Sequence, residues 1–99
     1  MRKKFQSVLY RREGRTTLEV RGEIDGSTAA ELCDRLQALR LEECCLDFLR
    51  VKKMDAFSAS VLARGLTLVR ARGTHLTLAG PAGDSEPTQW LRYLSDALA

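Results

Sequence analysis

The sequence has few of the residues that most catalytic and metal sites use. Its 99 residues include one histidine, His75, and three cysteines, of which Cys44 and Cys45 are adjacent. Neighbouring residues of a strand point to opposite faces, and Cys33, the cysteine pair and His75 lack the spacing of converging metal ligands. Free cysteines that act as small buried hydrophobic residues fit this pattern and a reducing compartment. The sequence therefore predicts neither a metal site nor a bound cofactor.

Long apolar runs are missing as well. No stretch reaches the ~18 consecutive apolar residues that a membrane span needs. The segment Met1-Arg2-Lys3-Lys4 begins like a signal peptide, but Phe5-Gln6-Ser7 follows it in place of an apolar region. An apolar share of 44% and a charged share of 29% are typical of a soluble globular domain. We expect a cytoplasmic protein with one domain over residues 1–99, because a chain of this length supports a single core.

Positive charge is concentrated at the start of the chain. Residues 1–21 hold seven lysines and arginines against two glutamates, a surplus of five, while the rest of the chain is negative by two. Such a basic hairpin fits an acidic protein or an anionic lipid surface. The alternative, which we favour, is a solvated edge hairpin whose charges oppose aggregation. Nucleic acid is not expected as a partner, because no aromatic stacking platform accompanies the charge.

The first half of the chain predicts a hairpin followed by a helix. Strands are expected over Lys4–Arg11 and Thr16–Ile24, with Glu13-Gly14 as the turn signal. Asp25-Gly26-Ser27 then breaks the second strand. Thr28-Ala29-Ala30-Glu31 has the pattern of a capping box and predicts the start of a helix at Thr28. Apolar residues follow at helical spacing and should pack on the sheet: Ala29, Leu32, Cys33, Leu36 and Leu39.

The second half predicts a repeated strand and helix pattern. The run Cys44–Leu49 reads as a central strand covered on both faces, followed by a short loop. A helix is expected over Ala56–Ala71, then a last strand around Leu76–Leu78, then a loop over Gly80–Ser85. A final helix should follow Glu86-Pro87. The predicted class is α/β, with a small mixed sheet (an N-terminal hairpin plus parallel βαβ strands) and three to four helices, joined by right-handed crossovers.

The segment Leu46–Leu62, LDFLRVKKMDAFSASVL, carries a resemblance to a known family. It is similar to the D-L-S-x-V-x-x-x-D-S-S-G-L-x-x-L signature of STAS domains, the fold shared by anti-sigma factor antagonists and the cytoplasmic tails of sulphate transporters. Asp47, Val51, Asp55 and Leu62 fall at matching positions without a gap. Two flanking segments resemble the family's strand motifs in the same order: Leu18–Asp25 and Gly73–Gly80.

One departure from this signature bears on function. In the antagonist branch, the second serine after the aspartate accepts phosphate from a partner kinase. Counted onto this chain, the first serine falls on Ala56, the acceptor on Phe57 and the glycine on Ser58. Phenylalanine has no hydroxyl group, so the usual phosphorylation cannot occur there. Ser58 is a possible displaced acceptor, although one further residue on a helix means a rotation of ~100°.

The resemblance implies a non-catalytic protein-interaction module of regulatory type, similar to an anti-sigma factor antagonist. The expected partner is an anti-sigma-type kinase, a permease subunit as in lipid-transport ABC systems, or a signalling assembly of several such domains. Phe57 either turns into the core or stays exposed as an interface anchor. The expected partner-binding residues lie in the loop after the second strand and in the first half of the second long helix: Asp25, Ser27, Thr28, Asp55, Ala56, Phe57, Ser58 and Val61.

Other classes of function are less well supported. His75 lies apart from any nucleophile pattern, and Gly80-Pro81-Ala82-Gly83 lacks the lysine of a P-loop, so we expect no enzyme. Asp25, Asp47 and Asp55 could converge as in a magnesium site, but a strand-end hydrogen bond for Asp47 and a helix cap for Asp55 are the simpler interpretations. A ligand-sensing protein that binds a nucleotide or lipid, and a homo-oligomeric building block, remain alternatives.

Overall fold

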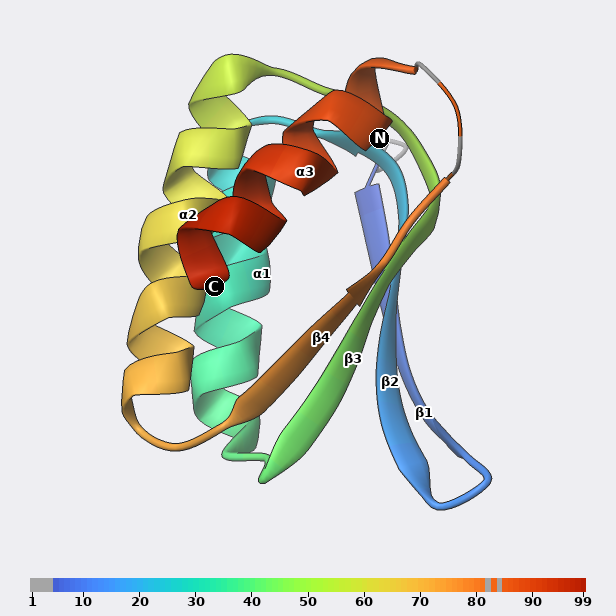
Figure 1. The fold of residues 1–99 in the computed structure, drawn as a ribbon. Coiled ribbons are helices and arrows are strands. Elements are labelled where there is room, and N and C mark those ends of the chain that lie inside the picture. The colour runs from blue at the N-terminus through green and yellow to red at the C-terminus, as the bar shows by residue number, and fades with distance from the viewer. Residues whose placement is uncertain (1–4, 82, 84) are drawn as a thin grey trace.

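The structure is a computed structural model, which describes residues 5–81, 83 and 85–99. Within these residues the chain forms four strands and three helices in the predicted alternation (Figure 1). Their bounds are β1 Phe5–Arg12, β2 Arg15–Ile24, α1 Gly26–Leu39, β3 Glu43–Met54, α2 Ala56–Ala71, β4 His75–Ala79 and α3 Glu86–Leu98.

The strands form one mixed sheet in the order β1-β2-β3-β4. β1 pairs with β2 in the antiparallel sense, with Phe5 opposite Gly22 and Arg12 opposite Arg15. The pairs β2–β3 and β3–β4 are parallel. The predicted class, an α/β fold with an N-terminal hairpin and parallel βαβ strands, is confirmed.

All three helices lie on the same face of the sheet (Figure 1). The strand order explains this for α1 and α2, because both crossovers advance the chain in the same direction along the sheet, and crossovers of one hand then place their helices on the same side. Helix α3 follows the last strand and packs beside α2 on that side. The prediction that the central strand is covered on both faces was therefore wrong. In β3, Cys44, Leu46 and Phe48 are buried, whereas Cys45 and Asp47, between them, are only half-buried.

The core fills the space between the helices and the covered face of the sheet. The strands contribute alternate residues, and α1 contributes four residues of the predicted stripe, while the fifth, Leu39, is only half-buried. The largest fully buried side chains of the core are Phe48, Leu18, Leu32, Leu36, Leu46, Met54, Leu62, Leu66 and Leu94.

Two contacts fix the position of α1 and α2 relative to each other. Gly65 of α2 has no side chain, and a Cβ there would lie 2.6 Å from Cβ of Cys33 on α1 and closer still to its Sγ, so the glycine permits close helix packing. At the other end, the guanidinium group of Arg72 donates to the carbonyl oxygen of Leu36 at 2.6 Å and to that of Gln37. These bonds satisfy carbonyl groups that the C-terminus of α1 leaves without helical partners.

The structure corrects two predicted boundaries. Helix α1 begins at Gly26, not at Thr28, because Asp25 caps it and Thr28 occupies the third helical position. Strand β3 continues to Met54, where a loop was expected after Leu49. The register of β2 against β3 shifts between Glu19 and Arg21 and again between Gly22 and Glu23, so the strand passes through irregular pairs without ending.

Some expectations fall on residues outside those described. They are the leader-like segment Met1–Lys4, the start of the first strand at Lys4, and positions 82 and 84 of the loop Gly80–Ser85. The assignment of the whole chain, 1–99, to one domain stays a prediction. Among the described residues, none of the helices has the length and apolarity needed to cross a membrane.

Candidate interaction surface

The N-termini of α1 and α2 lie at the same edge of the sheet. β2 ends at Ile24 and β3 ends at Met54, and these two residues are paired in the parallel ladder. An aspartate follows each strand directly and caps the next helix, Asp25 for α1 and Asp55 for α2. Because parallel strands place their carboxyl ends together, the two caps become neighbours although 30 residues separate them in sequence.

Asp25 forms a capping box with Thr28. Its carboxylate oxygen Oδ1 accepts from the Thr28 N–H at 2.9 Å and from the Ser27 hydroxyl at 3.0 Å. In return, the Asp25 N–H donates to Thr28 Oγ1 at 2.8 Å. The backbone N–H of Thr28, followed by the hydroxyl groups of Ser27 and Thr28, holds the pKa of the Asp25 carboxyl below its usual value. Asp25 is thus ionised at neutral pH at the positive end of α1.

Asp55 forms the same arrangement with Ser58. Asp55 Oδ1 accepts from the Ser58 N–H at 2.7 Å, and the Asp55 N–H donates to Ser58 Oγ at 3.1 Å. The bond from the Ser58 N–H, and then that from its hydroxyl, lowers the pKa of Asp55, while the negative charge of Asp25 acts in the opposite direction.

Ser58 has a structural role at this site. It is fully buried, and its hydroxyl donates to the Asp55 carbonyl oxygen at 3.0 Å while accepting from the Asp55 N–H. A kinase would have to open the first turn of α2 to reach this oxygen. The suggestion of Ser58 as a displaced phosphate acceptor stays a prediction, but this geometry gives it no support.

Phe57 lies on the surface, with 68% of its area exposed. Its ring extends over the start of α1, where Gly26 leaves room for it. A Cβ at Gly26 would lie 2.6 Å from Cδ2 of Phe57 and closer still to Cε2. Of the two orientations considered from the sequence, the outward one is found. Phe57 thus bridges the N-termini of α1 and α2 through its contact with Gly26.

The other expected site residues differ in how far their side chains are exposed. Ser27 and Ala56 are exposed in the first turns of α1 and α2, and Thr28 is half-buried by its part in the capping box. Val61 is partly buried against the core, so only part of its side chain can face a partner. We name the surface formed by Asp25, Ser27, Asp55, Ala56 and Phe57 the cap surface.

Sequence reasoning missed Gly26 and the true partner of Asp25. The sequence did contain a signal for the pairing of Asp25 with Thr28. The pattern Asp-x-x-Ser/Thr occurs twice, at Asp25–Thr28 and at Asp55–Ser58. In this pattern the carboxylate accepts from the backbone N–H of the third helical residue, and the hydroxyl of that residue accepts from the backbone N–H of the aspartate. The contact between Gly26 and Phe57 has no local signal, since it joins two helices through the tertiary fold.

The remaining candidate chemistry lies away from the cap surface. Asp47 Oδ1 accepts from the Leu49 N–H at 2.8 Å, so Asp47 forms a local hydrogen bond as expected. It does so inside β3 and not at a strand end, because the strand continues to Met54. Burial raises the pKa of the thiols of Cys33 and Cys44 to about 11, which keeps them protonated. In the described part of the chain, no three His, Cys, Asp or Glu side chains are grouped as metal ligands.

The predicted basic hairpin is present at the end of the sheet where β1 turns into β2. Arg11, Arg12 and Arg15 are exposed there, and the Arg12 guanidinium lies 5.6 Å from the centre of the Tyr10 ring. Further along the sheet, Glu19 pairs with Arg21 and lies 3.7 Å from Arg50. Part of the positive charge is therefore neutralised on the uncovered face.

Fold and site together define a small α/β domain in which two neighbouring helices each begin at a capping aspartate. The sequence matches the family model described as "Mlab, STAS domain" over residues 8–95, so the chain belongs to the STAS domain family. No curated protein matches the sequence closely enough to count as a relative.

Solved structures show the same fold. An anti-sigma factor antagonist from Mycobacterium paratuberculosis aligns with a TM-score of 0.65 and 17% identity, over 93% of this chain and 80% of that one. An anti-sigma factor antagonist STAS domain from Rhodobacter sphaeroides aligns with a TM-score of 0.60 and 16% identity, over 76% of this chain and 85% of that one. Part of a longer protein named Mglu is also similar, at a TM-score of 0.65 and 25% identity, over 75% of this chain and 19% of that one.

Proposed function

We propose that this chain is a non-catalytic regulatory interaction module that binds a protein partner through the cap surface, without phosphorylation at position 57. The observation that carries the proposal is the exposed Phe57 ring, which lies over Gly26 at the junction of two helices capped by aspartate. Phe57 is the most exposed of the large hydrophobic side chains in the described part of the chain, and aromatic residues are enriched among interface anchors. The resemblance to anti-sigma factor antagonists supports a regulatory role for such binding.

The cap surface also indicates the chemistry of the partner. A phosphoserine would carry roughly two negative charges at this place, whereas phenylalanine keeps it apolar at all times. The complementary surface should offer an apolar pocket for the ring, with hydrogen-bond donors for the neighbouring carboxylates. The same carboxylates repel phosphate groups, which argues against a nucleotide as the ligand of this surface. An anti-sigma-type kinase held without being its substrate fits these requirements.

A second candidate is an accessory subunit of a membrane transport complex of the lipid-transport ABC type. The exposed arginines of the hairpin, Arg11, Arg12 and Arg15, favour it, because a basic surface suits a place near anionic lipid headgroups. In that case the cap surface would bind the permease or another subunit of the complex. A larger signalling assembly of several STAS domains would use the same surface.

Affinity capture from the cells that express the protein tests the proposal. The tagged chain and its Phe57→Asp variant are used in parallel, and the bound proteins are identified by mass spectrometry. We expect a specific partner to be enriched by the parent and lost with the variant, while circular dichroism of the two chains is the same. An ATP-binding anti-sigma protein would identify an antagonist, and a permease or transport ATPase would identify the second candidate. Retention of every bound protein by Phe57→Asp would contradict binding through the cap surface.

A further inference from the structure

Strand β4 is an edge of the sheet with unpaired backbone groups. β3 is its neighbour on one side, and no described strand lies on the other. The His75 N–H donates to the Glu42 carbonyl oxygen at 2.8 Å, so His75 directs its backbone groups toward β3. Because successive residues of a strand alternate, Leu76 and Leu78 direct their N–H and C=O groups outward. These four groups form a template for another strand.

One common form of edge protection is missing from β4. Edge strands normally carry charged residues or proline that discourage pairing, and the opposite edge, β1, ends in Arg11 and Arg12. β4 reads His-Leu-Thr-Leu-Ala, without lysine, arginine, acid or proline. In a chain with a net charge of +3, this edge is where two copies can meet with little repulsion.

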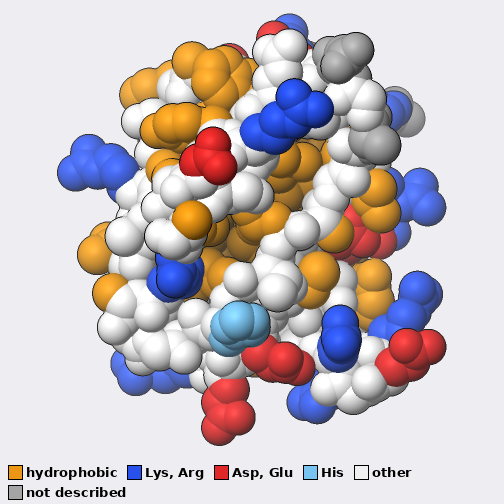
Figure 2. Space-filling model, viewed as in Figure 1, with side chains coloured by type: hydrophobic (Ala, Val, Ile, Leu, Met, Phe, Trp, Pro, Cys, Tyr) orange, Lys and Arg blue, Asp and Glu red, His pale blue; other side chains and the backbone are white. Residues whose placement is uncertain are grey.

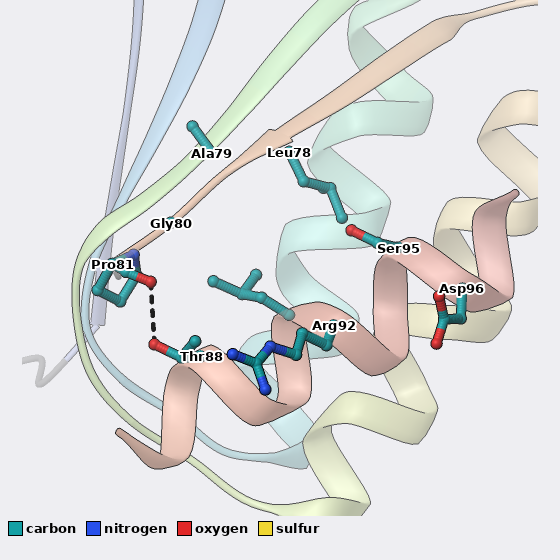
Figure 3. Close-up of a pocket in the computed structure, with 9 residues that line it drawn as sticks. Leu78, Ala79, Gly80, Pro81, Thr88, Arg92, Ser95 and Asp96 are labelled. Atoms are coloured by element: carbon teal, nitrogen blue, oxygen red, sulfur yellow. Dashed lines mark hydrogen bonds between the residues drawn. The ribbon is translucent and has the colours of Figure 1, made fainter. Parts of the chain in front are cut away.

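A groove of about 370 Å³ lies beside this edge, between β4 and α3. Figure 2 shows it as a hollow with hydrophobic side chains at its base. In Figure 3, Leu78 lies close to Ser95 on α3, while Pro81 accepts a hydrogen bond from Thr88 at the other end. Arg92 and Asp96 on the α3 side carry opposite charges, so the rim has no net charge. Leu76 and Leu78 are only half-buried along this side.

We propose that a second copy of this chain pairs antiparallel with β4, about a two-fold axis through Thr77. This register places Leu76 opposite Leu78 of the other copy, so all four outward backbone groups of each copy are satisfied by the partner copy. It also keeps the faces consistent, with leucines on the helix side and Thr77 against its equivalent on the uncovered face. Such isologous pairing requires a self-complementary surface, and the pattern Leu-Thr-Leu is symmetric about its centre.

A second copy suits this edge better than an unrelated strand. Cross-strand threonine pairs are favourable, and the two histidines would each face an alanine and not each other. The strand itself has no lysine, arginine or acidic side chain with which to select a partner of opposite sign. Pairing would join the two sheets into one and would leave the cap surface of each copy, at the ends of β2 and β3, available for partner binding.

Cysteine cross-linking tests the register directly. In a Cys45→Ser background, which removes the half-exposed thiol, Thr77→Cys should form an intermolecular disulfide under mild oxidation. Residues in a non-hydrogen-bonded antiparallel pair have Cα atoms about 4.5 Å apart, a separation that suits a disulfide. His75→Cys is the matched control, because the two residues would be about 13 Å apart along the paired strands. Absence of a disulfide in Thr77→Cys, or equal yields in both variants, would overturn the proposed register.

Light scattering over a range of concentrations tests the association itself. The parent chain should shift from monomer to dimer as its concentration rises. Thr77→Lys places like charges opposite each other at the axis and should weaken the dimer roughly fivefold or more. Gln6→Lys adds the same charge to an exposed position of β1 and should have no such effect. A parent that stays monomeric, or a dimer that Thr77→Lys leaves unchanged, would overturn the proposal.

Discussion

At the scale of single residues, the surface depends on one exposed aromatic ring and two carboxylates. Phe57 stands where the resemblance to STAS domains places a phosphate-accepting serine, so this position has no charge to gain. Asp25 and Asp55 already occupy the N-termini of α1 and α2 through short hydrogen bonds. The surface is therefore apolar at its centre and negative at its margin, in a fixed state that a kinase acting at position 57 cannot change.

The capping aspartates should make the stability of the fold depend on pH in the acidic range. Their pKa values are lowered in the folded chain, so the unfolded chain binds more protons as the pH falls. The stabilisation is complete above the unfolded pKa of about 4 and is lost as the pH drops through the lower folded values. We expect the melting temperature to fall steadily below about pH 4.

A paired substitution isolates this effect. In the variant carrying both Asp25→Asn and Asp55→Asn, the side chains still accept the capping hydrogen bonds but no longer titrate. Its melting temperature should be lower than that of the parent near neutral pH and should change less between pH 5 and pH 2. The measurement is a set of thermal melts across this range. An identical slope in the two proteins would show that other carboxylates govern the acid response.

At the scale of elements, the cap surface exists because two strand–helix junctions meet. Ile24 and Met54 are register partners, and each is followed by its own capping aspartate. The close packing of α1 on α2 at Gly65 and Cys33 then fixes the helix starts near each other. The ring of Phe57 completes the junction by lying over Gly26.

A double-mutant cycle measures the contact between these two helix starts. Gly26→Ala alone should gain less stability than the up to about 1 kcal/mol that alanine gives over glycine in a helix, because the new methyl group displaces the Phe57 ring. In a Phe57→Ala background this obstacle is absent, so Gly26→Ala should be more favourable there. We expect a coupling of about 0.5 kcal/mol or more from thermal or urea unfolding. Strict additivity of the two changes would contradict the observed contact.

The sequence predicted the bounds of an element well where its apolar residues follow the helix or strand period, and less well where charged residues interrupt that period. Helix α2 was predicted with the bounds that the structure gives, since its cap and its glycine stop are local signals. The end of β3 was missed because Arg50, Lys52 and Lys53 are exposed and break the apolar pattern of the strand. The burial of Val51 and Met54 depends on the irregular pairing of β3 with β2, which the sequence does not indicate. The start of α1 was missed because the capping pattern of Thr28 and Glu31 competed with that of Asp25.

Within the candidate site, too, features with a local sequence signal were predicted, and features that depend on tertiary packing were missed. Local patterns predicted Asp55 as a cap, and the resemblance marked position 57 as the departure of interest. Burial of Ser58 and the placement of the Phe57 ring depend on how α1 and α2 pack, which no local pattern encodes. The one-sided helix layer likewise follows from the order of the strands in the sheet, not from the composition of β3.

At the scale of the whole molecule, a single layer of helices leaves three distinct surfaces. One is the cap surface, the second is the uncovered face of the sheet with its basic hairpin, and the third is the edge of β4. The cap surface, the basic hairpin and the outer edge of β4 lie at different places on the sheet, so the proposed partner binding, the place near a membrane and the self-association are compatible with one another.

The affinity of the captured partner for two matched variants tests the central claim most directly. Phe57→Asp and Leu68→Asp both place a carboxylate at an exposed apolar position of α2, and Leu68 lies about 16 Å further along the helix. The account predicts that Phe57→Asp weakens binding about 30-fold, as for an interface anchor, while Leu68→Asp changes it by about twofold at most. Equal affinity of the parent and Phe57→Asp, with both chains folded, would contradict the assignment of the cap surface as the binding site.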